Sequence, residues 1–159
     1  MIRPYQDNDW ADLVRFVSEI QEHERINVPE LKSGSEIGET YSKHLLKQVA
    51  ANDGVILMAQ YEGKNIGMIC AWKGSDDDQL LKEDFREHGY ISDIYVSEER
   101  RRKGTAKKLL DAVESTMRSK GCKRMRVCSK ASNAEAINFY KAEEFSPYEI
   151  IFSKSLKGA

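Results

Sequence analysis

The sequence lacks the features of secreted and membrane proteins. Its longest aliphatic run, residues 55–59, is far too short to cross a membrane. Its first residues, MIRPYQDNDW, contain no apolar segment of a secretion signal. The three cysteines are odd in number, lack C-x-x-C spacing and lie in or beside apolar patterns, which favours reduced core thiols. We therefore expect a cytoplasmic protein without a membrane partner. The cysteines are Cys70, Cys122 and Cys128.

Neither sign of charge dominates, and few residues disrupt regular structure. The 159 residues include 25 basic and 26 acidic side chains, three prolines and 40% hydrophobic residues, as in an ordinary globular protein. The sequence has no internal repeat, linker or low-complexity tract, so we expect a single domain over residues 1–159. Residues 100–126 contain eleven of the 25 basic residues, an asymmetry that favours a local anionic ligand.

Apolar periodicity predicts an alternation of strands and helices. Helical segments repeat apolar residues at intervals of three and four, whereas strand segments alternate or are apolar on both faces. The expected order is a strand at 1–5, a helix capped within 7–9, a loop at 23–35, a helix at 36–52, a hairpin of strands at 55–61 and 65–72, a mobile loop at 73–89, a strand at 90–96, a helix after 106, a strand at 123–128, a short helix from 133, and a last strand or pair of strands at 145–152. This order is typical of an α/β protein, with helices flanking a sheet.

The buried faces of these elements can also be predicted. The two hairpin strands are apolar on both faces, so they should lie centrally under helices. Gly121 should end the third long helix. The residues expected on buried helix faces are Leu13, Phe16, Val17 and Ile20 in the first helix, Ile37, Tyr41, Leu45 and Val49 in the second, and Leu109, Leu110, Val113 and Met117 in the third.

Residues 101–106, R-R-K-G-T-A, form a basic turn between a strand and a helix. The missing side chain of Gly104 would let backbone N–H groups approach an anion closely, and the positive end of the helix dipole points to the same place. Strand, turn, helix and returning strand make a βαβ unit, whose ligand should lie beyond the carboxyl end of the first strand. The pattern therefore predicts a phosphate-bearing cofactor.

Two motifs in this region resemble those of a known family. Arg101, Gly104 and Ala106 match the acetyl-CoA signature Q/R-x-x-G-x-G/A of the GNAT superfamily of N-acetyltransferases, directly after a strand that ends I-Y-V. The downstream motif N-x-x-A-x-x-F-Y is filled from Asn133 to Tyr140. The order of elements is similar as well, so the resemblance covers nearly the whole chain. The departures are Arg102 in place of a frequent glycine, Ser97-Glu98 without the common proline, and Glu144 in place of a glycine.

The resemblance implies a fold and a cofactor site. The fold is the GNAT acyl-CoA N-acyltransferase fold, in which a central mixed sheet, bulged and splayed, is flanked by helices. The co-substrate is acetyl-CoA, with no metal. Its diphosphate would lie on the N–H groups and charges of the turn, and its thioester carbonyl would face backbone N–H groups of the splayed strand. The implied cofactor-binding residues are Ile94, Tyr95, Val96, Arg101, Arg102, Lys103, Gly104, Thr105, Ala106 and Asn133.

Two positions have both a structural and a functional interpretation. Asn133 would contact the pantetheine arm, and it is also a common type of helix cap. By its place in the family motif, Tyr140 would protonate the departing thiolate, because a phenol with a pKa of about 10 can donate to a thiolate whose conjugate acid has a pKa of about 8.5. Periodicity alone would also fit Tyr140 as a core aromatic beside Ile137.

Asp93 is a candidate general base, because it is a carboxylate within an otherwise apolar strand, on the same predicted face as Ile91 and Tyr95. A protonated amine has no lone pair, so some group must take its proton, directly or through water. A salt bridge or a position at the solvated edge of the strand would explain Asp93 equally well. Weaker alternatives from the flanking segments are Glu22, Glu24, Glu87 and His88.

The expected reaction is direct attack of a primary amine on acetyl-CoA in a ternary complex. Acidic residues in the segments that should frame the acceptor favour a cationic amine, although they could also only solvate two exposed loops. As partners we expect a small-molecule or peptide amine, without nucleic acid, and we leave a homodimer open. The acidic residues are Glu19, Glu22, Glu24, Asp76, Asp77, Asp78, Glu83, Asp84, Glu87 and Asp93.

Other chemistries lack the residues that they need. Residues 23–27, H-E-R-I-N, begin like a zinc-binding H-E-x-x-H but have Asn at the second ligand position, so no metal is expected. Neither a G-x-S-x-G elbow nor a G-x-x-x-x-G-K-[ST] loop is present. A catalytically silent acetyl-CoA sensor stays open as an alternative. A nucleic-acid-binding module is weaker, because the basic stretch 100–126 has no Phe, Trp or Tyr to stack on bases.

Overall fold

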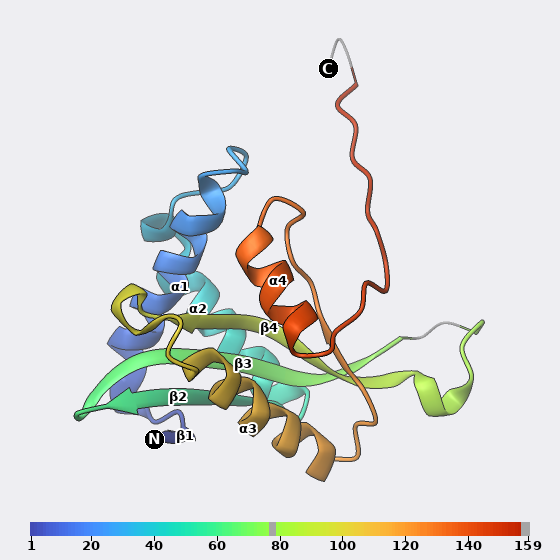
Figure 1. Cartoon of the computed structure of the whole chain (residues 1–159), viewed down its shortest axis with the longest axis horizontal. Coiled ribbons are helices and arrows are strands. Elements are labelled where there is room, and N and C mark those ends of the chain that lie inside the picture. Colours follow the sequence, from blue (N-terminus) through green and yellow to red (C-terminus); the bar gives the residue numbers. More distant parts are fainter. Residues whose placement is uncertain (77–78, 157–159) are drawn as a thin grey trace. The chain divides into compact units, whose positions relative to one another are not determined.

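The computed structural model describes residues 1–76 and 79–156, and it contains a five-stranded mixed sheet with the order β1-β2-β3-β4-β5 (Figure 1). The first four strands are antiparallel neighbours, and β5 is parallel to β4. The α/β prediction is confirmed. The strands are β1 (Ile2–Pro4), β2 (Val55–Tyr61), β3 (Lys64–Ser75), β4 (Glu87–Val96) and β5 (Met125–Val127). The helices are α1 (Trp10–Arg25), α2 (Gly34–Ala51), α3 (Thr105–Ser119) and α4 (Ala134–Ala142), with short 3-10 turns η1 (Asp7–Asp9), η2 (Glu83–Phe85) and η3 (Glu98–Arg100).

The chain divides into two compact units, residues 1–128 and 129–159, which are described in turn. The expectation of a single domain over residues 1–159 remains a prediction. None of the helices within the described residues is long and apolar enough to cross a membrane.

In the first unit, α1 and α2 cover one face of the sheet and α3 covers the other (Figure 1). Leu13, Phe16 and Val17 of α1 and Leu45 of α2 are buried, as their spacing predicts. The helix α2 begins two residues earlier than expected because Ser33 and Glu36 form a capping box. The core on this face consists of Leu13, Phe16, Val17, Leu45, Ile56, Met58, Met68, Cys70 and Tyr95.

The opposite face of the sheet is covered by the apolar stripe of α3, and its four predicted residues, 109, 110, 113 and 117, are all buried. The helix ends where predicted. Gly121 adopts φ +89°, its N–H donates to Arg118 O at 3.0 Å, and the N–H of Cys122 donates to Met117 O at 3.0 Å. These bonds satisfy the last carbonyl groups of the helix, and glycine adopts the left-handed conformation without steric cost.

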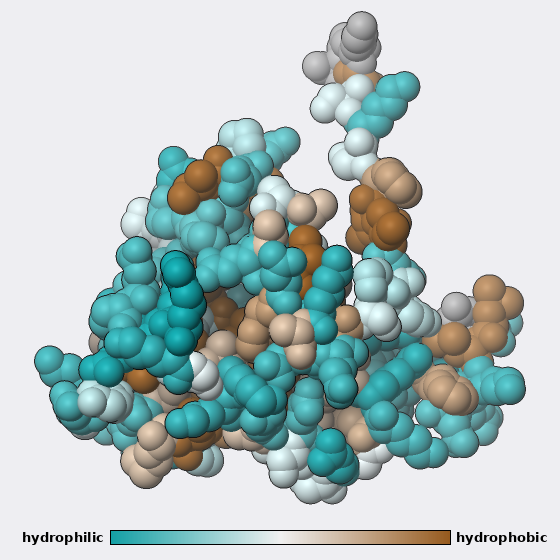
Figure 2. Space-filling view, viewed as in Figure 1, coloured by the Kyte–Doolittle hydropathy of each residue, from teal (hydrophilic) through white to brown (hydrophobic). Residues whose placement is uncertain are grey.

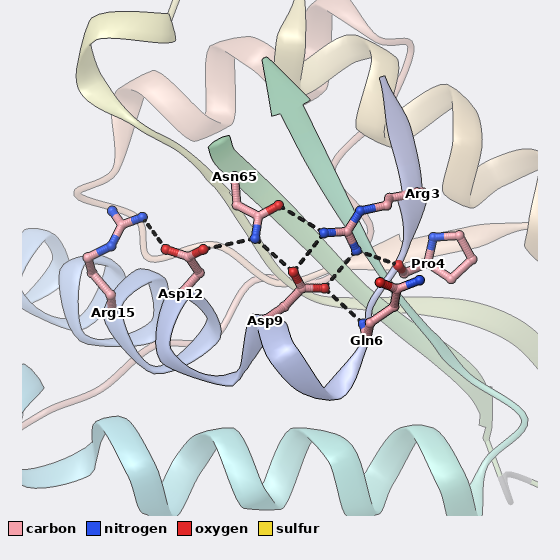
Figure 3. Close-up of polar contacts among 7 residues, drawn as sticks. All are labelled: Arg3, Pro4, Gln6, Asp9, Asp12, Arg15 and Asn65. Atoms are coloured by element: carbon pink, nitrogen blue, oxygen red, sulfur yellow. Dashed lines mark hydrogen bonds and ion pairs between the residues drawn. The ribbon is translucent and has the colours of Figure 1, made fainter. Parts of the chain in front are cut away.

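A polar cluster around the buried Asp9 fixes β1 to the start of α1 and to the start of β3 (Figure 3). Arg3 donates to both carboxylate oxygens of Asp9 at 2.7 Å, and Asn65 donates to Asp9 and to Asp12 at 2.8 Å. Asp12 in turn accepts from Arg15 at 2.7 Å. Hydrogen bonding from Arg3 holds the pKa of Asp9 far below its usual range, with smaller contributions from Asn65 and the Gln6 amide. Asp9 is therefore a buried but fully compensated anion.

The expected loop at 73–89 is wrong at both ends. The strand β3 continues to Ser75 and β4 begins at Glu87, because residues 73–75 pair with residues 87–89. These residues are mostly polar or glycine, so apolar alternation could not reveal them as strand. Asp76 is not a free rim carboxylate, since it forms ion pairs with Arg126 at 2.5 Å and Arg124 at 3.6 Å. Asp77 and Asp78 lie outside the described residues.

The cysteine prediction is confirmed for two of the three side chains. Cys70 and Cys122 are buried free thiols, whereas Cys128 is an exposed free thiol. Cys128 directly follows β5, which ends at Val127 and is itself only partly buried.

In the second unit, α4 ends in the same motif as α3 but without glycine. Glu144 adopts φ +66°, its N–H donates to Lys141 O at 3.2 Å, and the N–H of Phe145 donates to Tyr140 O at 2.9 Å. The rings of Phe145 and Tyr140 pack at 5.6 Å, the apolar contact typical of this motif. Glu144 thus preserves the path that glycine would follow, at a steric cost of about 1 kcal/mol.

The expected strand or pair of strands at 145–152 is wrong. Residues 145–156 pair with no strand among the described residues, and apart from Phe145 their large apolar side chains are exposed (Figure 2). Ile151 and Phe152 are 90% and 91% exposed. Apolar composition indicated a strand, but a strand also requires a partner, which composition does not specify.

Candidate active site

The strand β4 is paired on both sides over only part of its length. It pairs with β3 from Glu87 to Val96, but with β5 only at residues 89–91. Beyond Ile91, residues 93–96 pair with β3 but with no second strand among the described residues. The predicted splay is therefore confirmed. It leaves one edge of β4 without strand pairing at the carboxyl end, just before the basic turn.

A β-bulge at Ser92 marks the beginning of this open half. Asp93 lies opposite Cys70, whereas Ile91 lies opposite Ala71, so Ser92 is an extra residue without an opposite partner. Cys70 and Ala71 are consecutive and point to opposite faces, so Asp93 faces α1 and α2 while Ile91 faces α3. The expectation that Asp93 and Ile91 share a face is wrong, because the bulge reverses the alternation. Tyr95 shares the face of Asp93.

The open edge carries backbone groups that point away from β3. The N–H of Ser97 donates to Ile66 O on β3 at 2.8 Å. Because the peptide groups of an antiparallel strand alternate in direction, those of Ile94 and Val96 point to the other side. Val96 O confirms this direction, since it accepts from Arg101 Nε at 3.1 Å. The same bond fixes Arg101 to the end of β4.

The basic turn forms a concave set of amide groups. Its φ angles alternate in sign through −66° at Arg101, +56° at Arg102 and +76° at Gly104. Within the described residues, the N–H groups of residues 102–106 donate no backbone or side-chain hydrogen bond. Alternating φ signs that turn successive N–H groups to one side create an anion-binding nest. A Cβ at Gly104 would meet nothing within 4 Å, so the space in front of the turn is open. The turn therefore fits a diphosphate.

Arg102 departs from the family pattern without changing the path of the turn. It adopts the positive φ that a glycine would adopt freely, and it adds a cation beside the amide groups. The two departures from glycine, Arg102 and Glu144, thus both occupy left-handed conformations.

Asp93 lies in a small hydroxyl cluster between β4 and α2. Its Oδ2 accepts from Ser92 Oγ at 2.5 Å and from Tyr41 OH at 3.3 Å, and these two hydroxyl oxygens are 3.3 Å apart. Burial raises the pKa of Asp93, and Glu24 raises it further, whereas the hydrogen bonds from Ser92 and Tyr41 lower it. Asp93 forms no salt bridge with a described residue. The alternative in which a salt bridge explains Asp93 is therefore not supported by the described residues.

Tyr95 connects the open half of β4 to α1. Its hydroxyl donates to Glu19, and its ring stacks on Phe16 with the centroids 4.7 Å apart. Burial raises the pKa of Tyr95 to about 12, and the hydrogen bond to Glu19 adds to the shift. Arg15 donates to the other carboxylate oxygen of Glu19 at 3.4 Å, and so joins it to the cluster of Figure 3.

A pocket of about 540 Å³ lies between α1, Tyr95 and the segment that leads into the basic turn. Glu22 is held in it, because it accepts from Gly34 N at 2.6 Å. Glu98 has no ion-pair or hydrogen-bond partner for its carboxylate among the described residues. The residues that line the pocket include Arg15, Glu19, Glu22, Tyr95, Glu98 and Arg101.

The predicted acidic rim is divided between the two ends of β4. At the amino end, Glu87 pairs with Lys73 and Asp84 pairs with Lys123, both at 3.7 Å. His88 is buried opposite Gly74, and burial lowers its pKa. His88 is five residues from Asp93, which corresponds to about 16 Å along a strand. The side chains near the amino end of β4 therefore lie apart from Asp93, whereas Glu19 and Glu22 lie near its carboxyl end.

The second unit contains the other two predicted residues. Asn133 caps α4, because its Oδ1 accepts from Ala136 N at 3.1 Å. The ring of Tyr140 packs against Phe139 at 5.4 Å and Phe145 at 5.6 Å, and Tyr140 is 8% exposed. The structural interpretations of both residues are therefore present, and their catalytic and binding roles remain predictions.

Sequence reasoning missed the hydroxyl partners of Asp93. Tyr41 was assigned to the buried stripe of α2, and nothing in the sequence distinguishes its hydroxyl from that of another core tyrosine. Ser92 received no role because the bulge that places it beside Asp93 is not visible in the alternation. Glu98 belongs to a visible departure from the family pattern, because Ser97-Glu98 lacks the common proline. This departure did not indicate that Glu98 lines a pocket.

Known proteins share both the sequence pattern and the fold. Residues 17–145 match the model of the acetyltransferase (GNAT) family. A thialysine N-epsilon-acetyltransferase from Bos taurus is 26% identical over 151 residues, which cover 89% of this chain and 81% of the relative.

Solved structures show the same fold at low identity. A mutant of the BH1408 protein from Bacillus halodurans has a TM-score of 0.79 and 19% identity, with coverage of 98% of this chain and 99% of that chain. An aminoglycoside N-acetyltransferase in complex with CoA has a TM-score of 0.72 and 18% identity, with coverage of 99% and 94%. The family match, extending over most of the sequence and containing the basic turn, shows that this chain belongs to the acetyltransferase (GNAT) family and is an acetyl-CoA-dependent N-acetyltransferase.

Proposed function

We propose that the enzyme transfers the acetyl group of acetyl-CoA to a primary, cationic amine by direct attack in a ternary complex. The observation that carries the proposal is the open half of β4, residues 92–96, which joins a carboxylate on one face to an anion-binding turn at its end. Acetyl-CoA supplies an acetyl group already activated as a thioester.

The turn holds the diphosphate through the N–H groups of residues 102–106, and Arg102 and Lys103 add positive charge there. The outward peptide groups of Ile94 and Val96 supply donors for the thioester carbonyl. A fixed donor aimed at developing negative charge is typically worth about 3 to 4 kcal/mol of the barrier. Tyr95 positions this segment through its hydrogen bond to Glu19.

Asp93 takes the proton that the attacking amine loses, directly or through a water molecule. The burial that raises its pKa makes it a better proton acceptor than an exposed carboxylate. Tyr140 gives its phenolic proton to the sulfur. One C–N bond forms and one C–S bond breaks. Asp93 then releases its proton to solvent and Tyr140 takes one up from solvent. The second proton of the original ammonium group also leaves to solvent, so each turnover of a cationic amine releases one proton in total.

The acceptor is cationic because the pocket beside Tyr95 is rich in carboxylates. Glu19 and Glu22 are already engaged by other donors, so Glu98 is the carboxylate most available to an incoming ammonium group. The names of the relatives are compatible with such acceptors, since one acts on thialysine and another on aminoglycosides.

A thiol-release assay with acetyl-CoA and a panel of cationic, neutral and acidic amines tests this function. We expect turnover with cationic amines, falling as ionic strength rises, because the attraction is screened over about 8 Å at physiological salt. Glu98→Gln should raise KM for these amines, and the exposed neighbour Glu99→Gln is the matched control. A preference for neutral or acidic acceptors would overturn the cationic assignment, and acetyl-CoA binding without any turnover would identify a sensor.

Tyr140→Phe tests the acid. We expect kcat to fall by about a hundredfold while acetyl-CoA affinity stays unchanged, because only the protonation of the thiolate is lost. Tyr148→Phe removes a hydroxyl from the same unit and should keep wild-type turnover. Wild-type turnover in Tyr140→Phe, with chemistry rate-limiting, would show that the hydroxyl is structural.

A further inference from the structure

The hydroxyl cluster around Asp93 has an asymmetry that the reaction can use. Both hydroxyl donors, Ser92 and Tyr41, bind the same carboxylate oxygen, Oδ2. Oδ1 accepts no hydrogen bond from a described residue. A carboxylate has about four acceptor sites on its two oxygens, so the cluster fixes one oxygen and leaves the other to accept a proton.

Three separate elements produce this arrangement. The bulge in β4 turns Asp93 toward α2 and places Ser92 directly beside it. The helix α2 supplies Tyr41, whose ring stacks on His44 with the centroids 5.7 Å apart. A buried tyrosine hydroxyl normally requires a partner, and here the partners are Ser92 and Asp93. The cluster therefore restrains both the rotation and the charge of the carboxylate.

We propose that Tyr41 and Ser92 are positioning residues that hold Asp93 with its Oδ1 directed at the proton of the acceptor amine. This inference rests on the proposed role of Asp93 as the general base. Tyr41 and Ser92 do not contact the reacting atoms. They act through Asp93, by fixing the orientation of its carboxylate and by stabilising its ionised form through hydrogen bonds.

Other groups around Asp93 also influence its pKa or titrate near it. On α1, the charge of Glu24 raises the pKa of Asp93, and on α2, His44 lowers it. On β3, Cys70 lies directly opposite, and burial, with a smaller contribution from Asp93, raises its thiol pKa, so it stays neutral. On β4, burial raises the pKa of Tyr90 to about 12, so it is neutral as well. Glu24 and His44 are therefore the charged or titratable groups that a variant must leave intact.

Removing either hydroxyl donor should raise the pKa of Asp93, because each donor stabilises the charged form. A base with a raised pKa stays protonated to a higher pH, so the acid limb of kcat/KM against pH should move toward alkaline pH. For Tyr41→Phe we expect kcat/KM to fall by about threefold to tenfold on the acid side and to recover on the alkaline plateau. Ser92→Ala should move the limb in the same direction.

The direct test is a carbon-13 NMR titration of aspartate-labelled protein, with Asp93→Asn used to assign the signal. This readout needs neither acetyl-CoA nor a known acceptor. We expect the titration midpoint of Asp93 to rise in Tyr41→Phe and in Ser92→Ala. Tyr5→Phe is the matched control, because Tyr5 packs against the same core but does not contact Asp93, and its midpoint should equal that of the wild type.

The NMR and kinetic results together separate the two proposals. Midpoints that do not move in either variant overturn the positioning role, whatever the activity. A midpoint that rises without any movement of the acid limb shows that Asp93 is not the base, and it overturns the inference while leaving acetyl transfer intact. Absence of thiol release from the wild type with every amine overturns the proposed function and this inference with it.

Discussion

The two halves of β4 differ in what surrounds them. At residues 89–91 the strand has a neighbour on each side, and the acidic side chains nearby are paired with Lys and Arg. At residues 92–96 one neighbour is missing, a bulge turns Asp93 toward the helices, and the strand leads into the basic turn. The closed half is built for stability, and the open half presents the polar groups that a substrate can use.

The open half depends on support from outside the sheet, because it lacks one strand partner. Tyr95 is held by Glu19, and Glu19 is joined through Arg15 and Asp12 to the polar cluster of Figure 3. Asn65 in that cluster is the second residue of β3, near the carboxyl end of β4, where Gly67 lies opposite Val96. Side-chain hydrogen bonds thus replace part of the rigidity that a second strand would provide.

The largest effect is expected in the open half, from Gly104→Asp. The substitution adds bulk and negative charge where phosphate must approach the amide groups, so acetyl-CoA affinity should fall about a thousandfold, or about 4 kcal/mol. Isothermal titration calorimetry measures it. Gly63→Asp is a matched control, because Gly63 has the same φ of +76° and equally open surroundings in the β2–β3 turn. Equal affinities in both variants would contradict the assignment of the turn.

The next effect concerns the support of the open half. Asp9→Asn leaves the partly buried Arg3 without its ion-pair partner and should lower the free energy of unfolding at pH 7 by about 3 kcal/mol. The folded-state pKa of Asp9 is depressed, so its contribution is complete above about pH 4 and is lost as pH falls toward the folded value. Chemical denaturation across pH should therefore show the gap between wild type and variant closing in acid.

A matched surface change sharpens this result. Asp7→Asn alters an exposed carboxylate of the same short turn, and it should change the free energy of unfolding by less than about 0.5 kcal/mol. A gap for Asp9→Asn that stays constant from pH 7 to pH 2 would show that lost packing, and not the ion pair, is responsible.

The smallest effect is expected in the closed half. A Cβ at Gly89 would overlap the Met125 sulfur and approach Met117, which are flexible side chains that can partly give way. Gly89→Ala should therefore lower the free energy of unfolding by about 1 to 2 kcal/mol while leaving acetyl-CoA affinity unchanged. Thermal denaturation and calorimetry on one preparation measure both. Weaker acetyl-CoA binding with unchanged stability would reverse the roles assigned to the two halves.

The sequence predicts the parts of this site that depend on local chemistry. The turn at 101–106 and the end of α3 at Gly121 follow from glycine and helix chemistry, and the structure contains both. The faces of α1 and α3 follow from apolar spacing in the same way.

The sequence does not predict what depends on pairing between distant residues. The bulge at Ser92 is set by β3, so alternation along β4 alone placed Ile91 on the wrong face. The acidic side chains before β4 predicted a rim of free carboxylates. Instead, Asp76 pairs with Arg124 and Arg126, and Asp84 pairs with Lys123. Residues 145–152 have the composition of a strand, but no partner strand is present among the described residues.

Amide hydrogen exchange with and without acetyl-CoA tests the contrast between the two halves most directly. We predict that acetyl-CoA slows exchange at Ile94, Val96 and residues 102–106, because these N–H groups have no acceptor among the described residues until the ligand provides one. Exchange at residues 89–91 should not change, since these residues are already paired on both sides. Protection confined to residues 89–91, or saturating acetyl-CoA without protection of the turn, would contradict the account.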